Sequence, residues 1–274
     1  MIKSKGVFLC VFLVAMLAIS VPSFAYDNSP SDSVIVPEAI WAAASGGGTW
    51  VTELQLTDIS GGSVVDVYFW YSGGGGTYRY VGNFWTSPGQ YHSIKFSNIL
   101  NTLYAYDPSF TYYGRSGALW FFTQDTSHKI LAATRTVNGS YGKTNVGLNW
   151  VDSNCANLGR SMVIQNLTQN ANYRTFVGIF NATSGGWEVT VEFRLINYNN
   201  GMVGSAFTKT IAPWDFIAFN PFAEAGVPSG YYDNVWLWIH PTASGNTAKG
   251  LICYASSANN VTNDTAAHIA VQFQ

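Results

Sequence analysis

The sequence is poor in charged residues. Asp, Glu, Lys and Arg make up 10% of its 274 residues, against about 25% in a typical soluble domain. Disordered chains combine high net charge with few aromatic residues, whereas 47% of this chain is hydrophobic and 16% is aromatic. Nucleic-acid binding relies on Lys and Arg, and here 13 basic residues face 15 acidic ones. We therefore expect an ordered globular protein that does not bind nucleic acid.

Long hydrophobic runs are confined to the N-terminus. Lys3 and Lys5 precede an apolar run over residues 7–21, and Ser23-Phe24-Ala25 supplies a small-x-small cleavage site. This order is typical of a secretory signal peptide, and the run is shorter than the roughly 20 residues of a transmembrane helix. We expect a signal peptide at 1–25, cleavage after Ala25 and a secreted or cell-surface protein without a transmembrane helix.

Cysteine is scarce, and cleavage of the signal peptide leaves only Cys155 and Cys253. Because export places both thiols in an oxidising compartment, we expect them to form a disulfide. The bridge would close a loop of about 100 residues and stabilise the fold by up to roughly 4–5 kcal/mol. Thiol labelling of unfolded, unreduced protein should then find no reactive thiol. The alternative is a buried, reduced Cys253 and an exposed, reduced Cys155, which labelling would reveal.

The mature sequence shows strand periodicity rather than helical periodicity. Short runs rich in Val, Thr, Tyr, Phe and Trp are separated by Gly, Asn, Ser and Asp, as in strands joined by turns. Residues 187–195 alternate strictly between apolar and polar side chains, which indicates a strand with one buried face. A turn of helix is expected only between Phe96 and Leu103. The pattern predicts an all-β protein.

The chain also resembles itself. Residues 50–58 align with 173–181, 60–62 with 184–186, and 118–121 with 235–238, in the same order. Ordered matches of this kind indicate an internal duplication. We expect two tandem antiparallel β-sandwich (Ig-like) domains, with one continuous barrel of about twelve strands as the alternative. The predicted boundaries are an extension over 26–33, repeat 1 over 34–150, a linker over 151–157 and repeat 2 over 158–274.

One strand of the second repeat is apolar on both faces. Val177 and Ile179 match inward positions of the first repeat, whereas Phe176 and Phe180 point to the opposite side. Strands that are apolar on both faces are usually covered on both, and an exposed pair of Phe would form an association patch. We therefore expect Phe176 and Phe180 to form an interface between the repeats, with another subunit or a ligand as alternatives.

Several segments together resemble a family of secreted bacterial proteins built from two tandem β-sandwich repeats. These segments are residues 48–54 (GTWVTEL), 113–119 (YGRSGAL), 134–142 (TRTVNGSYG), 174–181 (RTFVGIFN) and 254–264 (YASSANNVTND). The resemblance covers almost the whole mature chain in order. It implies export and the two-sandwich fold, and it implies no established activity.

Residues with catalytic or metal-binding potential are few. The four His residues show no metal-ligand spacing, and no GxSxG motif is present. Glu188 and Glu192 share a solvated strand face roughly 13 Å apart, beyond the separation that glycoside hydrolysis needs. Residues 259–264 are rich in oxygen ligands but lack the EF-hand pattern, so we expect a turn, with a calcium site left open. The sequence predicts no enzyme, no cofactor and no metal.

Three functions remain in competition. The first is a non-catalytic structural, adhesive or assembly role at the cell surface, with cell-envelope components or further copies of the chain as partners. The second is carbohydrate binding through exposed Trp and Tyr, and the third and weakest is an outer-membrane β-barrel. For glycan binding, the favoured surface is Tyr71, Tyr78, Arg79 and Tyr80, which flank the glycine-rich turn 72–77. The alternative for this segment is an ordinary β-hairpin.

Overall fold

The computed structural model describes residues 29–44, 47–86, 92–149, 161–183, 186–242, 250–261 and 265–273. The predicted signal peptide, the predicted linker 151–157 and Cys155 lie outside these residues, so the disulfide stays a prediction. All paired strands are antiparallel, and the prediction of an all-β fold is confirmed. No helix in the described residues is long and apolar enough to cross a membrane.

The first half of the chain forms a sandwich of two facing sheets. One sheet has the order β4-β3-β6-β1, with β9 also paired to β1, and the other has β5-β2-β7-β8. The long strand β1 joins both, because its last residues pair with β2 beyond a bulge between Val36 and Ala39. The strands are β1 (Ser33–Ala43), β2 (Thr49–Asp58), β3 (Val64–Tyr71), β4 (Tyr78–Trp85), β5 (His92–Phe96), β6 (Arg115–Thr123), β7 (Ile130–Asn138), β8 (Tyr141–Val146) and β9 (Leu148–Asn149).

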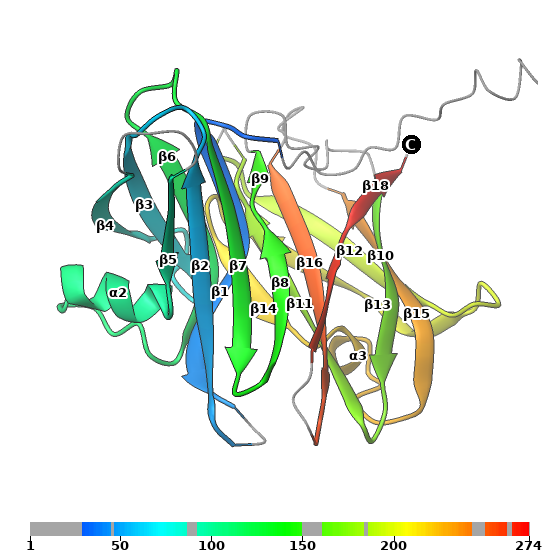
Figure 1. Cartoon of the computed structure of the whole chain (residues 1–274). Coiled ribbons are helices and arrows are strands. Elements are labelled where there is room, and N and C mark those ends of the chain that lie inside the picture. Colours follow the sequence, from blue (N-terminus) through cyan, green and yellow to red (C-terminus); the bar gives the residue numbers. More distant parts are fainter. Residues whose placement is uncertain are drawn as a thin grey trace, which may run out of the picture.

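The second half forms another sandwich beside the first (Figure 1). Its sheets have the orders β13-β12-β15-β10-β18 and β14-β11-β16-β17. Each half encloses its own apolar core. The strands are β10 (Ser161–Gln169), β11 (Tyr173–Asn181), β12 (Val189–Ile196), β13 (Met202–Ile211), β14 (Phe216–Phe219), β15 (Tyr232–Pro241), β16 (Leu251–Asn259), β17 (Thr265–Ile269) and β18 (Val271–Phe273).

The two halves share one topology. Strands β1 to β9 and β10 to β18 follow the same order in sequence and pair in the same way within their sheets. A helix lies at the same point in each half, α2 (Ile99–Tyr106) after β5 and α3 (Pro221–Glu224) after β14. Each helix begins after an Asn whose side chain accepts hydrogen bonds from the first turn. The bulge of β1 has a counterpart in β10, between Ile164 and Leu167.

The alternation expected for residues 187–195 explains the burial pattern of β12. Val191, Phe193 and Leu195 are fully buried in the core, whereas Arg194 is exposed. The alignment of residues 118–121 with 235–238 is wrong by one position. Leu119 faces the core, while the aligned Trp236 faces outward. A shift of one residue exchanges the two faces of a strand. The alignment did not detect the shift because Trp side chains on the outer face match the apolar pattern of the inner face.

A third apolar cluster joins the two halves. We call it the interface cluster, and it packs the outer faces of β1, β3 and β6 against those of β11, β14 and β16. The ring of Trp214, from the turn before β14, stacks on Trp120 at 5.4 Å. Its members are Ile35, Trp70, Ala118, Leu148, Phe180, Ala182, Phe216, Ile252 and Tyr254, with Tyr68, Trp120 and Trp214 partly buried against them.

Candidate functional site

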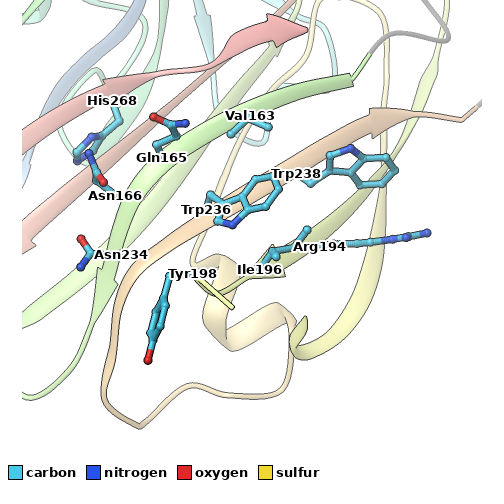
Figure 2. Close-up of a pocket in the computed structure, with 10 residues that line it drawn as sticks. All are labelled: Val163, Gln165, Asn166, Arg194, Ile196, Tyr198, Asn234, Trp236, Trp238 and His268. Carbon is cyan, nitrogen blue, oxygen red and sulfur yellow. The ribbon is translucent and has the colours of Figure 1, made fainter. Parts of the chain in front are cut away.

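An open groove runs along the outer face of the second sandwich (Figure 2). We call it the outer groove. It measures about 1220 Å³ and lies over β12, β15 and β10, on the side of that sheet that faces away from the core. Its lining residues are Val163, Gln165, Asn166, Arg194, Ile196, Tyr198, Asn234, Trp236, Trp238 and His268.

Two tryptophans form the floor of the outer groove. Trp236 and Trp238 lie two positions apart on β15, so that their rings share one face of the strand. Buried residues Val235, Leu237 and Ile239 alternate with them and fix the strand on the core. Both Trp side chains are half-buried. The sheet therefore presents two adjacent aromatic rings to solvent.

Neighbouring side chains hold these rings in place. The guanidinium of Arg194 lies 4.8 Å from the centroid of the Trp238 ring, and Arg194 is itself held by Glu192 at 2.8 Å. His240 stacks on Trp238 with centroids 4.9 Å apart. The indole N–H of Trp236 donates to the carbonyl of Asn197 at 3.4 Å. Rings fixed in this way lose little conformational entropy when a ligand binds.

Amide side chains gather at the end of the groove away from Trp238 (Figure 2). Asn166 and Asn234 line it with φ angles of 61° and 53°, a left-handed conformation that Asn tolerates better than most residues. Asn166 sits in the bulge of β10, where the extra residue redirects its side chain. Backbone strain of this kind is often found at binding sites.

His268 adds a polar ring at the same end. Burial, with a smaller contribution from nearby Lys143, lowers the pKa of His268. The imidazole is therefore neutral at neutral pH and can both donate and accept a hydrogen bond. Its Nε2 atom is buried and makes no hydrogen bond to another described residue. This nitrogen is an unsatisfied polar atom beneath the groove wall.

The outer groove is lined by aromatic, amide and imidazole groups. No carboxylate is found among the described residues that line it, and Arg194 is the cation of that lining. Paired carboxylates for general acid and base catalysis are thus not part of this surface. The groove offers aromatic faces, amides and a neutral imidazole. Groups of these kinds are capable of stacking and of hydrogen bonding.

The equivalent face of the first half is covered by protein. Ile35 of β1 pairs with Trp120 and Leu148, just as Val163 of β10 pairs with Trp238 and Val271. On the first half this face packs against Trp214 and Phe180 in the interface cluster. On the second half the matching face is the outer groove. One sheet surface thus binds the neighbouring half, and its counterpart is open.

The structure divides the four residues of the expected ligand surface between two faces of their hairpin. Tyr71 packs on Phe110 at 4.7 Å, and Arg79 lies 4.5 Å from the centroid of the same ring. Tyr78 and Tyr80 are exposed on the other face, where both pack against Tyr68. The register of β3 and β4 separates the two pairs because successive residues of a strand point to opposite sides.

The glycine-rich turn of that hairpin contacts the second half of the chain. Gly76 has a φ of 81°, and a Cβ atom at this position would lie 2.4 Å from the carbonyl oxygen of Pro213. The close approach therefore requires glycine. This contact brings the turn against the Pro213–Trp214 loop, whose Trp ring enters the interface cluster.

The two Phe residues expected at the repeat interface have different surroundings. Phe180 is 1% exposed and lies in the interface cluster, 5.6 Å from Trp70. Phe176 is 45% exposed and lines a pocket between the halves. Of residues 259–264, where a turn was expected and a calcium site was left open, Asn259 and Asn260 form a turn in which Asn260 accepts from Arg174 at 2.8 Å. Residues 262–264 lie outside the described part of the chain.

Sequence reasoning missed the outer groove. The signal for it was present as a Trp-x-Trp pattern on a strand, in which Leu237 faces the core and both Trp side chains occupy positions that are usually polar. Partners from β10, β12 and β17 leave no local signal because they are far apart in the sequence. Neither the protein-family models nor the curated proteins contain a match to this chain.

Proposed function

We propose that this protein is an exported, non-catalytic β-sandwich that binds a glycan chain along the outer groove. The observation that carries the proposal is the pair of adjacent, solvent-facing Trp rings in a groove bordered by amides. Aromatic rings pack well against the C–H faces of sugar rings, which are apolar. Asn and Gln both donate and accept hydrogen bonds, as sugar hydroxyls do.

The spacing of the two rings fits a chain rather than a single sugar. Positions two apart on a strand are separated by about 7 Å, comparable with the length of one sugar residue. Trp236 and Trp238 would therefore stack on neighbouring sugars. Asn166, Asn234 and His268 at one end of the groove would bind the hydroxyls of the sugar next to them. The predicted signal peptide supports this role, since cell-surface and extracellular glycans are accessible only to an exported protein.

Self-assembly of copies through the outer groove has less support. Within one chain, the face equivalent to the groove packs on the outer face of β11, β14 and β16. The equivalent strands of the first half are β2, β5 and β7. In such an assembly the groove would therefore bind the outer face of β2, β5 and β7 of another copy. That face is polar, with Arg135 lying 3.6 Å from Glu53 and Thr57 hydrogen-bonded to Ser93. Among the described residues of this face, Thr57 stands at the position equivalent to Phe180, and Leu131 of β7 is an exposed apolar side chain. An adhesive role through glycan binding is therefore favoured over assembly.

Alanine substitution of the groove tryptophans tests the proposal. We expect Trp236→Ala and Trp238→Ala each to weaken binding by more than tenfold to any polysaccharide that retards the wild-type protein. The reason is that aromatic anchors buried against a ligand dominate the binding energy. Affinity electrophoresis against a panel of soluble polysaccharides first identifies the ligand and then ranks the variants.

Trp187→Ala is the matched control for this experiment. Trp187 is an exposed Trp of the same half and does not line the groove, so its loss should leave polysaccharide retention unchanged. Equal retention of the wild type and both groove variants, or equal loss in the control, would contradict glycan binding at this site.

A further inference from the structure

A second pocket lies where the two halves meet. We call it the interface pocket. It has a volume of about 360 Å³, with walls from β1 and β8 of the first half and from β11 and β16 of the second. Ligand sites are frequent at boundaries between domains, and they combine apolar walls with a few polar groups. The volume suits one sugar-sized molecule and is too small for a polymer.

A buried charged pair lies in the wall of the interface pocket. The side chain of Lys143 is 3% exposed and makes an ion pair with Glu38. Asn145 donates to the same carboxylate at 3.2 Å. The hydroxyl of Tyr254 also donates to Glu38, and burial, followed by the charge of Glu38, raises the pKa of Tyr254 well above its usual range. The carboxylate of Glu38 is thus paired with three donor side chains.

The ammonium group of Lys143 has fewer hydrogen-bond partners than it has N–H donors. Its ammonium group has three N–H donors, and Glu38 is its one acceptor among the described residues. Buried donors without acceptors are unfavourable. Lys143 is a lining residue of the pocket with a buried ammonium nitrogen, and Arg174 adds a second cation to the wall. An oxygen ligand with negative charge would satisfy the remaining N–H groups through charge-assisted hydrogen bonds, which are the strong ones.

Hydroxyl groups line the rest of the interface pocket. Ser72, Ser116 and Ser256 line it, and none of their hydroxyl groups makes a hydrogen bond to another described residue. Phe176, which is 45% exposed, supplies an apolar wall. Serine hydroxyls beside an aromatic wall match a hydroxylated ring better than a fatty acid or an aromatic acid.

We infer that the interface pocket binds a monosaccharide unit that carries a carboxylate, such as a uronic acid. Its carboxylate lies on Lys143, its hydroxyls meet the serines, and one face of its ring packs on Phe176. The inference extends the proposed glycan-binding function to a second site. It does not require that the outer groove bind the same sugar.

Calorimetric titration with D-galacturonate and with D-galactose tests this inference. The two sugars differ in the carboxylate, so galacturonate should bind at least tenfold more tightly to the wild type. Ala218→Trp should abolish galacturonate binding, because Ala218 is an exposed residue at the pocket whose enlargement would fill it. Ala206→Trp, at an exposed position on β13 outside the pocket, should bind like the wild type.

Three outcomes overturn the inference. It fails if galacturonate does not bind, if galactose binds equally well, or if Ala218→Trp leaves binding intact. The Trp236→Ala and Trp238→Ala variants separate the two sites. Galacturonate binding that disappears in these variants and persists in Ala218→Trp belongs to the outer groove, which would support the proposed function and refute the interface pocket. If galacturonate binding is lost in Ala218→Trp and kept in both groove variants, the result supports binding in the interface pocket, whatever ligand the outer groove binds.

Discussion

Phe180→Ala should lower the free energy of unfolding by about 3–5 kcal/mol, the range for removing a fully buried Phe. Its side chain is 1% exposed and lies 5.6 Å from Trp70 and 6.4 Å from Trp214. The resulting cavity would lie between the halves and not in either core. We therefore expect urea denaturation to show two transitions, with Trp fluorescence and circular dichroism no longer coincident.

Phe176→Ala is the matched control on the same strand. Phe176 is 45% exposed, so the same substitution should cost no more than about 1 kcal/mol and leave the wild-type unfolding profile intact. Similar losses in both variants, or an unchanged midpoint for Phe180→Ala, would show that the interface cluster does not couple the halves.

Local patterns were sufficient to predict much of this fold. The alternation in residues 187–195 predicts β12, and the two apolar faces of residues 173–181 follow from the sequence alone. Val177 and Ile179 lie in the core of the second half, while Phe180 packs on the first half. Alternation does not give the pairing register, however. The alignment of residues 118–121 was wrong by one position for this reason, because Trp fits an apolar pattern on either face.

The candidate sites were harder to predict because their residues are distant in sequence. Glu38 and Lys143 are on different strands of the first half, and the interface pocket also needs Phe176 and Ser256 from the second. No motif spans these distances. The Gly-rich hairpin looked like a ligand surface because its Tyr residues are close in sequence. Its turn instead contacts the Pro213–Trp214 loop, a contact that only the packing of the two halves creates.

Glu38→Gln should destabilise the protein by about 3–5 kcal/mol, as expected when a buried ion pair loses one partner. The substitution preserves the shape of the side chain but leaves the buried ammonium of Lys143 without a counter-charge. It also weakens the hydrogen bonds that Asn145 and Tyr254 donate to the carboxylate. Chemical denaturation at neutral pH measures the loss. Lys143→Met should cost a similar amount because it leaves the carboxylate unpaired.

The double variant Glu38→Gln/Lys143→Met shows whether the charge pair is the cause. Removing both charges should destabilise the protein less than the sum of the two single substitutions, by more than about 1 kcal/mol. The reason is that the double variant contains no buried charge without a partner. Glu53→Gln supplies a control at an exposed pair, since the side chains of Arg135 and Glu53 are 51% and 41% exposed. Glu53→Gln should lower the free energy of unfolding by less than about 1 kcal/mol. Additive effects at Glu38 and Lys143, or equal losses at the two pairs, would show that the buried pair does not act as a unit at the junction of the halves.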